Sequence, residues 1–305
     1  MLKINDAVLR RLCEVYAYQV PDSGMVFFGL RGCLPVDPFN QKFRKELGVE
    51  AAPLDYLFPR CTLGQWLPTE QTVALYPGST VPHRSSLQSA LAKGGAGANQ
   101  LMPGYYKDYR KGVHKAAAPT GHDAFRQTAP RPIQRSADDL DIEQDDRVEY
   151  DNPQDNLHAA WCQGIDHPSY ASAGCQVIVG YPACAKRGSA PAVGPWRDFK
   201  ENAYALSQAS FSYALWNART AEAITGARGK VARRLTIGSD GPLVDAVQQA
   251  LRGKGFYEGE IDEDFGLRTL RAVIELQKHA FGADAADGIV GPNTAAALDI
   301  EWSQV

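Results

Sequence analysis

The chain has 305 residues, of which 44% are hydrophobic, and a formal net charge of -3 at pH 7. This length predicts about two domains, and the hydrophobic fraction is sufficient for a packed core. A slightly acidic chain lacks the excess of basic residues that is typical of proteins binding nucleic acid or anionic membrane surfaces, so we expect neither as a partner.

The N-terminal segment, from Met1 to Cys13, predicts an amphipathic helix. Asp6, Arg10 and Arg11 interrupt the apolar stretch that a secretory signal peptide requires. No run in the sequence approaches the ~18 apolar residues that cross a bilayer. We therefore expect a protein made in the cytoplasm without a signal peptide and without a membrane span.

The next part of the chain predicts short strands. Residues 24–34 form an apolar run closed by glycines, and residues 62–66 and 72–78 predict two strands joined by a polar turn. A short helix is expected from His83 to Ala98, with glycines near its end.

The stretch from Asn99 to Asp146 is rich in Gly, Pro, Tyr and Lys and then in acidic residues. It predicts a long loop, and its acidic end, Asp138 to Asp146, is interpreted as solvated. Two histidines in this region, His114 and His122, either line a cleft and contact substrate or are exposed residues without a role.

The most informative feature is a histidine, His158, that stands 17 residues before Cys175. The cysteine follows Ser172-x-Gly174 at the start of an apolar run. A free thiol is mostly protonated near neutral pH, and a neighbouring imidazole can act as its base. The glycine permits a sharp turn, so that main-chain N–H groups near Gly174 and Cys175 would stabilise an oxyanion, with Ser172 shaping the turn.

Each residue of this pair also has a purely structural interpretation. Free cysteine is among the most buried residue types, and a single histidine is more often a core residue with its hydrogen bonds satisfied. The combination of His158, Ser-x-Gly and Cys175 nevertheless favours catalysis.

The six cysteines lack the spacing of a small disulfide scaffold. A zinc set of His158, Cys162, His167 and Cys175 is conceivable, but these spacings differ from the usual short paired ligand motifs. We therefore expect no metal and no cofactor. The alternative, a zinc-dependent peptidase that uses His158, Cys175 and one further ligand, predicts stoichiometric bound metal.

After the cysteine, the pattern predicts a strand over residues 177–179, an amphipathic helix over residues 196–216 and a linker over residues 221–235. The last 70 residues contain an internal repeat of the form Asp-x3-Gly-x2-Thr, which begins at Asp262 and again at Asp287. Each copy predicts a tight turn leading into a helix. A further helix is indicated before them by apolar residues at helical spacing from Leu243 to Leu251.

The segment from His158 to Cys175 resembles the catalytic signature of the L,D-transpeptidase (YkuD-like) family, with matches at His158, Ser172, Gly174 and Cys175. The resemblance implies a mostly β, sandwich-like fold. It also implies a cysteine that attacks the carbonyl of the third residue of a peptidoglycan stem peptide. The resulting thioester is resolved by an amine or by water, and a backbone carbonyl orients the histidine.

Two departures from the family pattern bear on the reaction. Ala159 follows the histidine where the family usually has Gly, and Val177 stands where it usually has Arg. That arginine is associated with the floor of the active site and the substrate carboxylate. Its replacement favours hydrolysis slightly over cross-linking.

Residues Leu235 to Ile300 resemble the peptidoglycan-binding domain type 1 family, with one departure at Glu263, where the first turn often has Gly. The acidic, glycine and threonine residues of the repeat are interpreted as turn formers and helix caps. We expect Phe265, Arg268 and Gln277 to contribute the ligand surface.

The sequence thus predicts an α+β protein in which residues 1–220 form a mostly β, L,D-transpeptidase-like domain. Residues 221–235 form a linker, and residues 236–305 form a small three-helix peptidoglycan-binding domain. The expected function is a cysteine peptidase or transpeptidase on peptidoglycan stems, with carboxypeptidase or endopeptidase activity preferred. The alternative is a non-catalytic, peptidoglycan-binding component of a phage tail or contractile injection machine.

Peptidoglycan lies outside the cytoplasm, so such an enzyme would act in the periplasm or cell wall after an export route other than the general secretory one. A phage lysis pathway, an injection machine or delivery as an interbacterial effector would provide that route. A delivery machine, or a partner that inhibits the enzyme before delivery, is therefore an expected class of partner.

Overall fold

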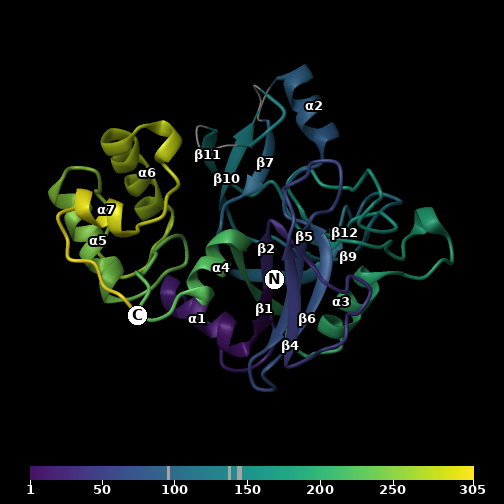
Figure 1. Cartoon of the computed structure of the whole chain (residues 1–305). Coiled ribbons are helices and arrows are strands. Elements are labelled where there is room, and N and C mark those ends of the chain that lie inside the picture. Colours follow the sequence, from purple (N-terminus) through teal and green to yellow (C-terminus); the bar gives the residue numbers. More distant parts are fainter. Residues whose placement is uncertain (95–96, 137–138, 143–145) are drawn as a thin grey trace.

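The structure is a computed structural model that describes residues 1–94, 97–136, 139–142 and 146–305. It is a mixed α+β protein whose N-terminal part is mostly β and contains a closed barrel. A bundle of three helices follows at the C-terminal end (Figure 1). None of the helices in these ranges is both long enough and apolar enough to cross a membrane.

The barrel closes through eight strands in the order β12-β13-β6-β5-β2-β14-β8-β9. In chain order these are β2 (Val26–Arg31), β5 (Cys61–Leu67), β6 (Thr72–Ser79), β8 (Gly104–His114), β9 (His122–Arg126), β12 (Leu157–Ala159), β13 (Gln176–Ile178) and β14 (Ser210–Asn217).

Aromatic side chains fill the barrel. Phe27 of β2 stacks on Phe211 of β14 with 4.5 Å between ring centroids, and Phe125 of β9 meets both rings edge-on. Such contacts combine a large buried apolar area with favourable ring geometry. The pairing of β2 with β5 also requires glycine at position 64 of β5, because a Cβ there would overlap the ring of Phe28 on β2.

Two three-stranded sheets flank the barrel. One has the order β1-β4-β3, with β1 (Leu2–Asn5), β4 (Glu46–Ala51) and β3 (Cys33–Pro35). The other has the order β11-β10-β7, with β11 (Arg147–Asp151), β10 (Arg131–Ser136) and β7 (Ala98–Leu101). The second sheet lies next to the active-site candidate described below and supplies Asn99 and Arg135 to it.

The helices lie outside the barrel, and α5 to α7 form the C-terminal bundle. They are α1 (Asp6–Tyr16), α2 (Arg84–Lys93), α3 (Pro195–Tyr204), α4 (Ala218–Gly226), α5 (Pro242–Gly253), α6 (Leu267–Phe281) and α7 (Pro292–Ala297), with short 3-10 turns at Ala185–Arg187 and Ala283–Ala285. The N-terminal helix is confirmed as α1: Asn5 caps it by accepting the Val8 N–H, and Leu9 and Leu12 are buried. This cap satisfies one of the free N–H groups of the first turn.

The strands expected within residues 24–34, 62–66 and 72–78 are confirmed as β2, β5 and β6, and β13 follows the cysteine as expected. The helix expected from His83 to Ala98 is shorter, because α2 ends at Lys93 and Ala98 begins β7. The acidic segment predicted as a solvated loop falls partly outside the described residues, at 137–138 and 143–145.

The long loop predicted from Asn99 to Asp146 is wrong, because β8, β9 and β10 lie there. The tyrosines of this region are not loop residues: Tyr105, Tyr106 and Tyr109 of β8 are buried. The helix predicted over residues 196–216 is also wrong in its second half. There α3 ends at Tyr204, and β14 follows with Tyr213 buried in the barrel.

The predicted linker over residues 221–235 is not a free tether. Its first part belongs to α4, which packs against α1 through Ala221 and Ile224. Its last part is extended and joins the two regions: Leu235 pairs with Val290, and the Tyr105 N–H donates to the carbonyl of Ile237 at 3.0 Å. The three-helix unit is therefore docked on the β region.

Candidate active site

The parallel pairing of β12 with β13 brings the predicted histidine and cysteine together. Leu157 lies opposite Gln176 and His158 opposite Val177, so Cys175, which directly precedes β13, lies beside His158. Both side chains are buried, with 2% of His158 and 8% of Cys175 exposed. A ring nitrogen of His158 lies within 4.8 Å of the Cys175 sulfur.

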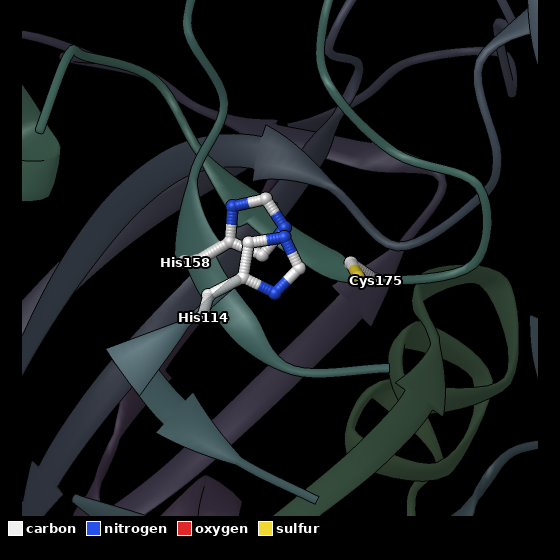
Figure 2. A group of neighbouring side chains, drawn as sticks. All are labelled: His114, His158 and Cys175. Carbon is white, nitrogen blue, oxygen red and sulfur yellow. The ribbon is translucent and has the colours of Figure 1, made fainter. Parts of the chain in front are cut away.

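Two further histidines, both from the hairpin of β8 and β9, lie in the same site. His114 at the end of β8 pairs with His122 at the start of β9, and β9 pairs in turn with β12. The ring of His114 stacks on that of His158, with 4.1 Å between centroids and 14° between planes. Figure 2 shows the two stacked rings with nitrogens on the edge that faces Cys175. His122 lies 5.4 Å from His158, centroid to centroid.

Hydrogen bonding fixes the tautomer of His158. Its Nδ1 lies 2.8 Å from the carbonyl oxygen of Ala159, which can only accept, so Nδ1 carries the proton. Nε2 then carries a lone pair, and this atom is buried without a hydrogen-bond partner among the described residues. Burial, together with the neighbouring His114 and His122, lowers the pKa of His158 well below its usual value. The imidazole is therefore a neutral base.

The thiol of Cys175 is in its protonated form. Burial, and then the charge of Asp155, raise the pKa of this thiol well above its ordinary value. Its sulfur lies 3.8 Å from the carbonyl oxygen of Gln154 and 4.0 Å from Oδ1 of Asp155. A neutral thiol beside a neutral imidazole can act as a nucleophile only if its proton is transferred during the attack.

Asp155 is a member of the site that no sequence pattern predicts. Its carboxylate accepts a hydrogen bond from Asn99, and its backbone N–H donates to Gln127 at 2.8 Å. Burial raises the pKa of Asp155 to about 7, against the opposing effect of Arg135 and Arg131. No local pattern marks this residue, because its partner Asn99 comes from a distant strand.

Ser172 and Gly174 build the turn before the cysteine. The Ser172 hydroxyl donates to the carbonyl of Cys175 at 2.8 Å and accepts the Gly174 N–H at 3.2 Å. Gly174 has φ of 154°, and a Cβ there would overlap the Asn99 amide and lie 2.6 Å from Asp155. Glycine is thus required by both conformation and space. The Gly174 N–H, expected to face an oxyanion, is already engaged.

A cavity of about 680 Å³ opens over the pair of His158 and Cys175. Its rim includes the exposed cations Lys115 and Lys186, which can attract a carboxylate. Val177, which stands at the family's arginine position, is fully buried beside His158 and does not line the cavity.

The described residues include one cluster with metal-ligand character, His114, His158 and Cys175, whose ligand atoms lie within 4.8 Å of one another. Cys162 and His167, the other members of the zinc set considered from sequence, do not belong to it. The donor set fits zinc only in part. The amide of Asn156 faces Nδ1 of His114 at 2.8 Å and places that ring's proton on Nε2, so two lone pairs converge rather than three.

The ligand surface predicted for the C-terminal domain is largely wrong. Phe265 is fully buried, and only 2% of Gln277 is exposed, so neither side chain can reach an insoluble polymer. Arg268 is exposed on α6. Gln277 lies on the buried face of α6 together with its apolar residues, and Phe265 is buried just before that helix.

The repeat has a structural origin. Gln277 donates to Asp287 at 3.0 Å and to Thr294 at 3.1 Å, and it accepts from the Gly288 N–H. Gln248 joins the matching residues of the first copy, Asp262 and Thr269, in the same way. The interpretation of the acidic and threonine residues as structural agrees with this bonding, and a buried glutamine completes each unit.

A comparison with known protein families supports the assignment of the C-terminal domain. Residues 240–298 match the family described as putative peptidoglycan binding domain. The match supports the C-terminal peptidoglycan-binding domain and does not extend to the barrel. No curated protein and no solved structure matched the chain.

Proposed function

We propose that the protein is a cysteine peptidase that acts on the stem peptides of peptidoglycan. The observation that carries the proposal is the geometry of His158. Its Nδ1–H is held by the Ala159 carbonyl, and its Nε2 lone pair lies beside the Cys175 thiol under an open cavity. This arrangement supplies a nucleophile, a base and a residue that orients the base.

The reaction follows from the protonation states. As the Cys175 sulfur bonds to a substrate carbonyl carbon, its proton passes to Nε2 of His158 and the carbonyl becomes an oxyanion. The oxyanion then collapses, the C–N bond breaks, and His158 returns the proton to the departing amine. A water molecule attacks the thioester with His158 again as base, which releases the acid and regenerates the thiol.

The C-terminal domain supports the choice of substrate. A peptidoglycan-binding domain docked on the barrel would hold the enzyme on an insoluble polymer and raise the local concentration of stem peptides. The lysines at the cavity rim, Lys115 and Lys186, favour a substrate that ends in a carboxylate. We therefore keep hydrolysis of a stem peptide ahead of cross-linking, and action in the periplasm or cell wall after export as its setting.

Two properties of Cys175 favour a second candidate. Only 8% of Cys175 is exposed, and its environment disfavours the thiolate. These properties also suit a binding protein that retains the fold without the chemistry, such as a structural component of a phage tail or injection machine.

Mass spectrometry of muropeptides incubated with the full chain separates the two candidates. The enzyme proposal predicts loss of a terminal residue or cleavage of a cross-link by the wild type. It predicts no change with Cys175→Ala or with His158→Ala. A wild type that binds sacculi but leaves stems of several lengths unchanged would favour the binding protein.

A further inference from the structure

His114 contacts the candidate catalytic pair from a strand that the sequence signature does not include. Its neutral form is secured by burial and by His122, which lower its pKa to about 4. A neutral imidazole carries one proton, on either Nδ1 or Nε2, and its hydrogen-bond partner decides which. The position of that proton decides whether His114 donates to a substrate or accepts from it.

Asn156 makes this choice. The backbone N–H of Gln127 donates to Oδ1 of Asn156 at 3.0 Å, which fixes the orientation of the amide. The NH₂ end of the amide therefore faces Nδ1 of His114, at 2.8 Å. Because that NH₂ group can only donate, Nδ1 must accept, and the proton of His114 lies on Nε2.

The Nε2–H of His114 is available to a substrate. The ring stacks on His158 nearly in parallel, so neither ring's proton points at the other, and no hydrogen bond engages this nitrogen within the described ranges. His114 lines the cavity, and its ring lies on the side facing the Cys175 sulfur (Figure 2). A carbonyl carbon bonded to that sulfur would place its oxygen between the sulfur and the imidazole edge.

One of the two main-chain donors expected near the cysteine is engaged elsewhere. An oxyanion hole usually offers two N–H groups, and the Gly174 N–H is already bonded to Ser172. We propose that His114 is a catalytic residue whose Nε2–H stabilises the oxyanion formed at Cys175, and that Asn156 is the positioning residue that fixes its tautomer. The inference rests on the proposed cysteine chemistry.

Three variants of the full chain test this role on a muropeptide substrate. His114→Phe keeps a stacked ring and removes the donor, and Asn156→Asp keeps the shape of the amide but accepts from Nδ1–H, which moves the proton away from Nε2. Both are expected to lower kcat by about 10²–10³ with little change in KM. His279→Phe, at an exposed position of α6 outside this cluster, is the control and is expected to change kcat by no more than a few fold.

The tautomer is measured separately by ¹⁵N NMR of histidine-labelled protein. The inference predicts an Nε2–H form for His114 in the wild type and an Nδ1–H form in Asn156→Asp. An Nδ1–H form in the wild type would overturn this inference while leaving the proposed function in place. Equal kcat values for His114→Phe and His279→Phe in an active enzyme would do the same. A wild type without activity would instead remove the proposed function beneath it. Stoichiometric zinc that His114→Phe abolishes would replace the donor with a metal ligand.

Discussion

Replacing Asp155 by Asn is expected to stabilise the protein increasingly as the pH rises. Burial raises the pKa of this carboxyl from 3.8 to about 7 in the folded state. Because the folded chain holds the proton more tightly than the unfolded chain, this contribution to stability is complete below pH 3.8 and is lost as the pH approaches about 7. The shift corresponds to roughly 4 kcal/mol. An amide has no such proton, so the variant avoids the loss.

Urea unfolding of wild type and Asp155→Asn at about pH 5 and about pH 8 measures the effect. Relative to wild type, the free energy of unfolding of the variant should be about 2–3 kcal/mol more favourable at pH 8 than at pH 5, because part of the total is already lost below pH 5. Asp166→Asn, at an exposed position, should show no such trend. Asp155→Asn should also alkylate faster at Cys175 than wild type, because the charge of Asp155 helps to raise the pKa of that thiol. A difference between variant and wild type that does not change with pH would refute this reasoning.

Three other outcomes are expected. Gln277→Ala should destabilise the chain by ~2–4 kcal/mol in chemical unfolding, because several buried groups lose their partner, whereas Arg268→Ala at an exposed position should change little. Glu263→Gly should raise the free energy of unfolding by ~0.5–1 kcal/mol and increase Tm, because Glu263 has φ of 60° and its repeat counterpart is a glycine. In native-state alkylation followed by peptide mapping, the partly exposed Cys184 should react before the buried Cys175, whose rate should keep rising with pH.

The C-terminal domain was predictable because its signals are local. Turn residues at fixed intervals and apolar residues at helical spacing specify α5, α6 and α7, and Pro292 stands at the start of the last helix, where its missing N–H costs nothing. The ligand surface was not predictable in the same way. Gln277 and Phe265 have side chains that suit either a surface or a core, and only the packing of the helices decides between them.

The meeting of His158 with Cys175 was predictable from sequence only in part. The spacing of His158 and Cys175 reflects two adjacent parallel strands, which a single segment of sequence encodes. His114, Asp155 and Asn99 reach the site through barrel closure and a neighbouring sheet, and nothing around them in the sequence signals that meeting.

The strands β8 and β14 were missed for a related reason. The glycines, tyrosines and charged residues of β8 match a loop pattern over a short window, and the aromatic and apolar residues of β14 match a helix pattern. In the structure Tyr109 and Tyr213 nevertheless pack edge to face inside the barrel, with 5.4 Å between centroids. Contacts between strands so distant in sequence are decided by closure of the barrel rather than by local preference.

Intact-protein mass spectrometry after rapid acid quenching tests the central claim most directly. The full chain would be mixed with a purified muropeptide and its mass recorded over time. Cysteine chemistry predicts a transient mass increase equal to the acyl fragment, located on Cys175 by peptide mapping and absent from Cys175→Ala. Turnover of the muropeptide with no adduct and with full activity in Cys175→Ala would contradict the account.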